Sequence, residues 1–287
     1  MRLLVPAFLL VTAVSLAHAA LPPADADAVR QLLRDRKFAE AEAAAAKLTA
    51  AHPREADAFV LLGTVRMGKE DAEGAVKAFE KAAELAPDNS EVQRRLGDGY
   101  GFAALKAGML SKIGWAKKCR AAYEKAVALD PKSIAARQAL MGFHQQASLL
   151  GGGMTAAYAE AAEIKKLDAD RGRIAFAQLY AAEKKWAEAF TEFEEVLKTD
   201  PNNYLALFQV GRIAAISGER VERGMETLQK ALTLSPSAGA AGHDAAHWRL
   251  GMLFEKKGDK PAAKSAYEAA LKVNPKFAQA IEALKKL

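Results

Sequence analysis

The chain has 287 residues, of which 51% are hydrophobic and 26% charged, and its formal net charge is +6. A single cysteine excludes an intramolecular disulfide, and the interleaving of Lys with Glu excludes a strongly charged tail. No segment alternates Val, Ile and Thr with polar residues, as a half-buried strand does. Because alanine is abundant and aromatic residues are scarce, we predict an all-α protein of closely packed helices.

The N-terminal segment, residues 1–19, is typical of a signal peptide that is removed on export. Arg2 precedes an apolar run from Leu3 to Leu16, and Ala17 and Ala19 have the small-x-small spacing that signal peptidase accepts. The apolar run is shorter than the roughly 20 residues that a membrane-spanning helix needs. We therefore expect a periplasmic or secreted mature chain that begins after Ala19 and is not an integral membrane protein.

One pattern of residues recurs along the rest of the chain. Its clearest copy contains Leu250, Gly251, Phe254, Gly258, Ala263, Tyr267, Ala270 and Pro275. Earlier copies end at Pro53, Pro87, Pro131, Ala169, Pro201 and Pro236. Glycine and alanine let two helices cross closely, and proline ends a helix because it lacks an N–H group and clashes with the preceding turn. Each copy is therefore predicted to be a helical hairpin.

This signature resembles that of the tetratricopeptide repeat, whose unit has about 34 residues. The resemblance covers nearly the whole mature chain, residues 22–287, and implies a right-handed superhelical solenoid of about seven helix-turn-helix repeats. The expected repeats are approximately 22–55, 56–89, 90–133, 134–169, 170–203, 204–243 and 244–277, and a capping helix is expected at 278–287.

The third and fourth repeats depart from the regular pattern in ways that affect the turn between their helices. The step from Pro87 to Pro131 is 44 residues, whereas the step from Pro53 to Pro87 is 34. We therefore expect about ten extra residues around 107–116, between the two helices of the third repeat. In the fourth repeat, Gly151–Gly153 is expected to form the turn between the helices.

No motif of a catalytic or metal centre is present, whether G-x-S-x-G, G-x-x-x-x-G-K, H-E-x-x-H or paired cysteines. His243 and His247 have the spacing of two zinc ligands, but no third ligand lies nearby in the sequence. The simpler interpretation places His247 against its partner helix and His243 in the preceding loop. Cys119 takes an alanine position at a helix crossing, where burial is expected. We predict no enzyme activity, no metal site and no cofactor.

The extra residues of the third repeat contribute to the most basic stretch of the chain, residues 106–120. It contains Lys106, Lys112, Lys117, Lys118 and Arg120, with Trp115 among them. One interpretation is a solvated helix face, and the other is a site for anionic lipid or polysaccharide. No nucleic-acid partner is expected, because the aromatic residues that would stack on bases are not interleaved with the cations.

In the tetratricopeptide repeat family, the first helix of each repeat lines a concave groove that holds a peptide or helix of a partner. The resemblance assigns to this groove Arg94, Asp98, Phe102, Gln138, Gln145, Arg171, Gln178, Phe208, Arg212, Trp248 and Met252. Aromatic, Arg and Gln side chains are typical of protein-binding surfaces. The sequence thus predicts a scaffold or adaptor of the bacterial cell envelope with a protein or peptide partner. The alternative is an accessory factor for cell-surface polymer export or assembly that acts through residues 106–120.

Overall fold

The computed structural model describes residues 21–147, 152–237 and 240–287, and within these ranges it contains fifteen α-helices and no strand. The predicted all-α fold, with seven helix pairs and one further helix, is confirmed. The expected signal peptide lies outside the described residues. None of the described helices has the combined length and apolar character needed to cross a membrane.

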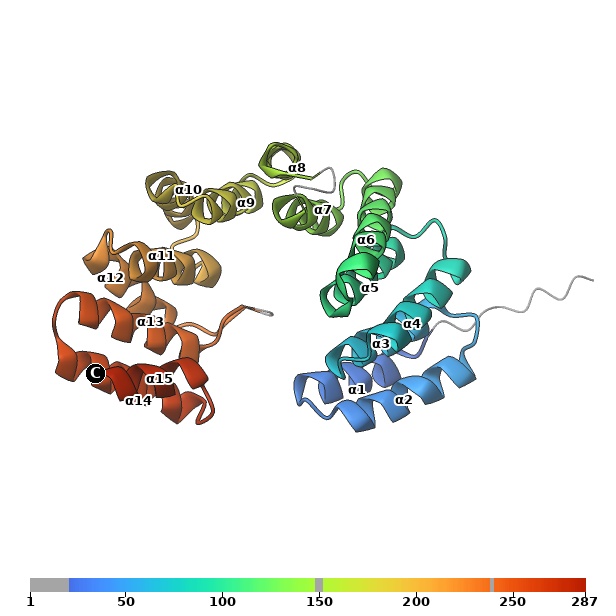
Figure 1. Ribbon diagram of the computed structural model, residues 1–287, viewed down its shortest axis with the longest axis horizontal. Helices are drawn as coiled ribbons and strands as arrows, with labels where there is room; N and C mark the ends of the chain where they lie inside the picture. Colours follow the sequence, from blue (N-terminus) through green and yellow to red (C-terminus); the bar gives the residue numbers. More distant parts are fainter. Residues whose placement is uncertain (1–20, 148–151, 238–239) are drawn as a thin grey trace, which may run out of the picture. The chain divides into compact units, whose positions relative to one another are not determined.

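The described residues form two compact units, one that ends at Leu129 and one that begins at Asp130. The first unit holds three helix pairs (Figure 1), which are α1 (Pro23–Arg34), α2 (Phe38–Ala51), α3 (Ala56–Gly68), α4 (Ala72–Leu85), α5 (Ser90–Lys106) and α6 (Met109–Leu129). The second unit holds four pairs and a last helix, which are α7 (Ile134–Gln146), α8 (Met154–Leu167), α9 (Ala169–Ala182), α10 (Trp186–Thr199), α11 (Tyr204–Ser217), α12 (Val221–Ala231), α13 (His243–Lys256), α14 (Lys260–Val273) and α15 (Ala278–Lys286).

Polar side chains fix where several of these helices begin. Asn89 accepts a hydrogen bond from the backbone N–H of Val92 at the start of α5, and Asn203 accepts one from Ala206 at the start of α11. Ser133, Asp168 and Asp259 cap α7, α9 and α14 in the same way. Such a cap satisfies a backbone donor that has no partner inside the helix. The short polar corners between repeats therefore determine the helix starts.

In four of the pairs, α3–α4, α5–α6, α11–α12 and α13–α14, the helices cross closely because the first helix carries glycine at the crossing. A Cβ atom on Gly97 would lie 2.4 Å from the ring of Tyr123, and one on Gly251 would lie 2.3 Å from the ring of Tyr267. Tyr123 and Tyr267 are themselves buried. The recurring glycine and the recurring aromatic residue of the sequence pattern thus form one contact, which brings the two helices together.

First helices of successive repeats also contact one another directly. In the first unit α1 packs on α3 and α3 on α5, and in the second unit α11 packs on α13 (Figure 1). Side chains on neighbouring first helices are therefore brought together although they are more than thirty residues apart in the sequence. The last helix, α15, packs on α14 through the buried Ala280 and the partly buried Leu284.

The extra residues of the third repeat lengthen its helices, and the expectation that residues 107–116 lie between the helices is wrong. α5 ends at Lys106 and α6 begins at Met109, so only two residues separate them. The two helices have 17 and 21 residues. The segment contains no proline, and Trp115 of α6 stacks on Tyr100 of α5 with ring centres 5.8 Å apart. This contact favours continuation of α6 along α5.

The described part of the expected glycine turn joins α7 to α8, while Gly151 lies outside the described residues. The N–H of Gly152 donates to the carbonyl of Ala147 at 3.1 Å, and that of Gly153 donates to the carbonyl of His144 at 2.7 Å. Gly153 has a φ of 124°, which a side chain would make unfavourable. Glycine is therefore required immediately before α8.

Candidate partner-binding surface

All eleven residues that the sequence assigns to the groove lie on first helices of repeats. Arg94, Asp98 and Phe102 lie on α5 in the first unit. In the second unit, Gln138 and Gln145 lie on α7, Arg171 and Gln178 on α9, Phe208 and Arg212 on α11, and Trp248 and Met252 on α13. Their surroundings differ greatly, and these differences separate structural residues from candidates for binding.

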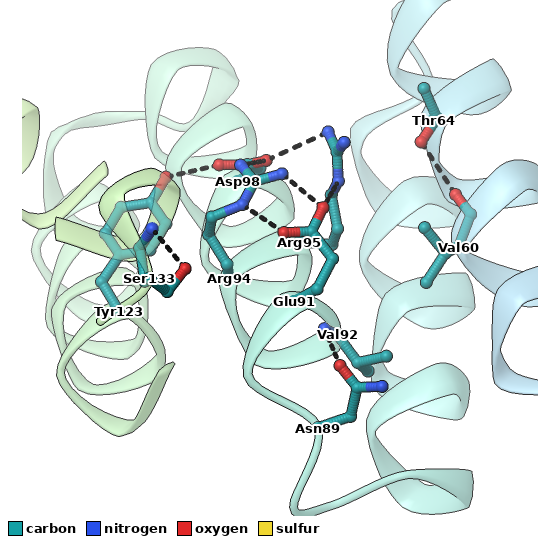
Figure 2. Close-up of polar contacts among 11 residues, drawn as sticks. Val60, Thr64, Asn89, Glu91, Val92, Arg94, Arg95, Asp98, Tyr123 and Ser133 are labelled. Atoms are coloured by element: carbon teal, nitrogen blue, oxygen red, sulfur yellow. Dashed lines mark hydrogen bonds and ion pairs between the residues drawn. The ribbon is translucent and has the colours of Figure 1, made fainter. Parts of the chain in front are cut away.

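Arg94 and Asp98 belong to an internal ion-pair network in the first unit (Figure 2). The guanidinium of Arg94 lies 2.7 Å from a carboxylate oxygen of Glu91 and 2.9 Å from one of Asp98. Asp98 also accepts a hydrogen bond of 2.8 Å from the hydroxyl of Tyr123, and Arg95 lies 3.6 Å from the same carboxylate. The network ties α5 to α6 and neutralises its own charges. It therefore stabilises the third repeat.

Other predicted groove residues are dispersed over α5, α7 and α9. Phe102 is half-buried, with the ammonium of Lys106 5.7 Å from its ring centre. Gln138 and Arg171 are exposed, whereas Gln145 and Gln178 are half-buried. The side chain of Arg171 lies 3.5 Å from that of Asp168, the residue that caps α9.

Phe208 and Trp248 are engaged in packing. Phe208 is only 6% exposed, and its ring stacks on Tyr204 with ring centres 6.4 Å apart. Trp248 is half-buried and meets Phe277 edge-on at 5.8 Å, in the cluster that attaches α15 to the chain. Phe208 therefore belongs to the core of the second unit, and Trp248 to the seam between α13 and the C-terminal helix.

Arg212 on α11 and Arg249 on α13 differ from the other arginines discussed. Arg212 donates to the amide oxygen of Gln209 at 3.2 Å, and Arg249 donates to the sulfur of Met252 at 3.4 Å. Neither guanidinium forms an ion pair with any carboxylate in the described part of the chain. Both are half-buried, so two poorly solvated cations lie on adjoining helices without a counter-ion.

The electrostatic state of Arg249 reflects this arrangement. Burial and, secondly, the positive charge of Arg212 lower the pKa of Arg249 to about 10. The group remains protonated at neutral pH, but its charged form is disfavoured by loss of water and by a like charge. An anion that contacts both guanidinium groups would relieve both effects, because charge-assisted hydrogen bonds to Arg are strong and often bidentate.

A pocket of about 450 Å³ adjoins this pair on the surfaces of α11 and α13. It is lined by Ala215, Ile216, Met252, Glu255 and Lys256. Met252 links the pocket to the pair, because its sulfur accepts the hydrogen bond from Arg249. Ile216 follows Arg212 by one helical turn and has an exposed side chain.

The charges around this pocket are mostly positive. Glu255 is the single carboxylate in its lining, and after burial its negative charge helps to raise the pKa of Tyr267. Lys256 is exposed and forms no ion pair within the described ranges. We call the surface formed by Arg212, Arg249 and the five lining residues the α11–α13 surface. It offers apolar contacts to a ligand beside three cations without carboxylate partners.

The sequence pattern pointed to Arg212 and Met252 but missed Arg249 and Ile216. A signal for both arginines was present, because no Asp or Glu stands three or four residues before or after Arg212 or Arg249. Arg94, in contrast, has Glu91 three residues before it and Asp98 four residues after it.

The two histidines and the cysteine that the sequence singled out take part in packing and helix contacts. His243 is the first residue of α13, not part of the preceding loop as expected, and its Nε2 lies 2.8 Å from the carbonyl oxygen of Leu234. Burial and then His243 lower the pKa of His247. No group of three His, Cys, Asp or Glu residues in the described ranges could hold a metal ion. Cys119 is buried, as predicted, and burial raises the pKa of its thiol to about 12.

Comparison with known proteins places these observations in a family. Two family models described as tetratricopeptide repeat match the chain, one at residues 26–90 and 174–239 and the other at 103–133 and 245–277. The chain is 35% identical over 106 residues to the tetratricopeptide repeat and J domain-containing co-chaperone DNJ1 of Fusarium oxysporum. That match covers 37% of this chain and only 19% of the relative.

Solved structures share the fold. A tetratricopeptide repeat protein from Parabacteroides merdae has a TM-score of 0.61 at 14% identity, over 91% of this chain and 96% of the other. PilF of Pseudomonas aeruginosa has a TM-score of 0.53 at 16% identity, over 81% of this chain and 97% of the other. The family matches cover more than half of the sequence, and the helix pairs that they predict are present, so the chain belongs to the tetratricopeptide repeat family.

Proposed function

We propose that this protein is an adaptor of the bacterial cell envelope and that its α11–α13 surface holds an acidic segment of a protein partner. The tetratricopeptide repeat fold is a scaffold for protein–protein interaction and is generally not enzymatic. The observation that carries the proposal is the pair of half-buried guanidinium groups, Arg212 and Arg249, which have no carboxylate partner in the described part of the chain.

Other arginines of the second unit form ion pairs with carboxylates and so contribute to the stability of the fold. Arg137 lies 2.8 Å from a carboxylate oxygen of Glu160, and both side chains are largely buried. Arg223 donates to both carboxylate oxygens of Glu194, each at 2.8 Å. Leaving a desolvated charge unpaired costs stability, so a protein tends to retain one where a ligand supplies the opposite charge. Arg212 and Arg249 fit that description.

The neighbouring pocket favours a peptide over a free inorganic anion. Ala215, Ile216 and the side chain of Met252 provide apolar contact beside the two guanidinium groups. A ligand with one or two carboxylates and an adjacent apolar residue would satisfy both parts of the surface. Arginine with a buried apolar contact is a frequent combination in the energetically important centres of protein interfaces.

The test is a fluorescence anisotropy titration of the chain after residue 19. The probe is a fluorescein-labelled dodecapeptide with four glutamates and two leucines, and the control peptide has glutamine in place of each glutamate. We expect saturable binding of the acidic peptide and much weaker binding of the glutamine peptide. The double substitution Arg212→Gln and Arg249→Gln should weaken binding by about 30-fold or more, since two charge-assisted hydrogen-bonding groups are lost.

A matched double variant controls for net charge. Lys230→Gln and Lys272→Gln remove two exposed cations from the second helices of the same repeats, α12 and α14. This variant should bind the acidic peptide within about twofold of the parent, because well-exposed charges outside the contact contribute little under salt screening. Equal loss of binding in both double variants would mean that the peptide responds only to the net charge of the protein. That result would contradict the proposal.

The envelope location rests on the pattern of residues 1–19, in which one cation, an apolar run and small residues at positions 17 and 19 follow one another. Expression of the whole chain in a bacterial host tests it. We expect the protein in the periplasmic fraction, with an intact mass that corresponds to cleavage after Ala19. Cytoplasmic protein of full mass would contradict an exported adaptor, while leaving the peptide-binding experiment unaffected.

A further inference from the structure

The end of the α5–α6 hairpin carries a group of exposed apolar side chains. Leu105 is 72% exposed, Met109 84%, Leu110 94% and Ile113 49%. These four make up half of the large apolar side chains that are exposed in the described part of the chain. They lie within nine residues, where α5 turns into α6 in the first unit (Figure 1). We call residues 105–113 the hairpin tip.

The apolar residues of the tip precede the packed part of α6. Met109, Leu110 and Ile113 are spaced so that they share one side of the helix. The buried positions of α6 begin at Ala116 and continue through Cys119 and Tyr123, so the part of the helix that packs on α5 starts after the tip. With exposed fractions of 49% to 94%, the apolar side chains of the tip contribute little to the contact between the two helices.

The sequence around this apolar tip carries only positive charges, one of which, Lys106, is paired with Glu70 of the α3–α4 turn. No Asp or Glu occurs between Asp98 and Glu124, and this interval contains five Lys or Arg residues. Lys106 lies 2.7 Å from Glu70, and Lys118 lies 4.8 Å from the ring centre of Trp115. Lys112 and Lys117 are exposed and form no ion pair with any described residue.

From this juxtaposition we propose that the hairpin tip docks into the headgroup layer of an anionic phospholipid bilayer. Leu110 and Ile113, with Met109, enter the boundary between headgroups and acyl chains, and Lys112 and Lys117 lie at lipid phosphates. Interfacial membrane segments combine exposed Leu, Ile or Phe with Lys in this way. The centres of protein interfaces are instead depleted of Lys, so an acidic protein partner fits the tip less well.

Co-sedimentation with vesicles tests the proposal on the chain after residue 19. One set of vesicles contains phosphatidylcholine with 30% phosphatidylglycerol, and the other contains phosphatidylcholine alone. We expect binding to the anionic vesicles and little binding to the neutral ones. Addition of 0.5 M NaCl should reduce the binding only in part, because apolar insertion is not screened by salt.

Two pairs of substitutions separate the apolar from the electrostatic contribution. Leu110→Gln with Ile113→Gln should weaken binding to the anionic vesicles by at least about tenfold, because two inserted side chains are lost. Lys112→Gln with Lys117→Gln should weaken it by at least about tenfold in low salt. The control pair, Leu167→Gln with Val273→Gln, removes exposed apolar residues in the second unit and should bind like the parent protein.

A fluorescent label reports where the contact occurs. The dye NBD, attached to Ser111→Cys, should brighten and shift to the blue on addition of anionic vesicles, whereas NBD on Ser237→Cys should not. Selective labelling is feasible because the native thiol of Cys119 is buried. Equal brightening at both sites would overturn the proposal.

Three further results would also contradict the tip as a membrane contact. One is the absence of binding to anionic vesicles, and another is unchanged binding by the Leu110→Gln, Ile113→Gln variant. The third is a fall in molecular mass of that variant in analytical ultracentrifugation, which would make the tip a contact between copies of the chain. None of these results bears on peptide binding at the α11–α13 surface, which is formed by other helices.

Discussion

The guanidinium of Arg249 lies over the indole of Trp248, with its central carbon 4.0 Å from the ring centre. This contact holds the Arg249 side chain beside Met252, to whose sulfur it donates, on the side of α13 that meets α11. A cation–π contact of this kind positions a charge without neutralising it. Trp248 is itself fixed by Phe277, so the C-terminal seam of the solenoid supports the α11–α13 surface.

Replacement of Arg249 by methionine tests whether its charge opposes folding. The lowered pKa means that the charged form is less favourable in the folded chain than in the unfolded chain, and this penalty is present wherever Arg249 is protonated, below its folded pKa of about 10. Arg249→Met should therefore leave the free energy of unfolding at pH 7 unchanged or raise it by up to about 1 kcal/mol, after allowance for the lost contact with Trp248.

The matched control is Arg137→Met, which leaves the largely buried carboxylate of Glu160 without its partner. This variant should lose about 3 kcal/mol in urea denaturation followed by circular dichroism. A comparable loss in Arg249→Met would show that Arg249 stabilises the fold and would weaken its assignment to ligand binding.

The glycine at a helix crossing should be sensitive to a single methyl group. In Gly251→Ala the new Cβ would lie 2.3 Å from the ring of Tyr267, so we expect a loss of about 2 kcal/mol in the free energy of unfolding. Gly142, in the interior of α7, has no atom within 4 Å of such a Cβ. Gly142→Ala should stabilise the chain by about 0.5 to 1 kcal/mol, and urea denaturation of both variants measures the contrast.

The thiol of Cys119 should be inert in the folded protein. Burial raises its pKa to about 12, so very little thiolate exists at pH 8. Reaction with Ellman's reagent should be at least about 100-fold slower than in 6 M guanidinium chloride, where the thiol has its ordinary pKa. Ser237→Cys, at an exposed position, provides the reactive control. Rapid stoichiometric labelling of the native parent chain would contradict the burial.

The sequence alone predicted the helix pairs because each one depends on a local rule. The contact of Gly251 with Tyr267 has counterparts at Gly63 with Phe79 and Gly97 with Tyr123, because a small residue that faces a ring lets two helices cross closely. The spacing between prolines gave the number of extra residues in the third repeat but not their place. Residues 109–116 extend α6 because Trp115 stacks on Tyr100 of α5. The length of a repeat does not predict that contact.

The candidate site was less predictable for a related reason. Position along a first helix placed Phe208 and Arg212 on α11, but burial depends on neighbours from other turns and helices. Phe208 packs against Tyr204, whereas the positive charge of Arg212 acts on Arg249 of α13 and lowers its pKa. The sequence alone shows that no Asp or Glu lies within four residues of Arg212 or Arg249. That Arg212 and Arg249 lie on adjoining helices could be learned only from the structure.

The binding of an acidic peptide at the α11–α13 surface is tested most directly by methyl NMR of the chain after residue 19. The δ1 methyl of Ile216 and the ε methyl of Met252 report on the pocket, while those of Ile113 and Met109 report on the hairpin tip of the first unit. Titration with the four-glutamate dodecapeptide should shift the Ile216 and Met252 signals saturably and leave the other two unchanged. Saturable peptide binding without shifts at Ile216 and Met252 would place the ligand elsewhere and contradict the proposed surface.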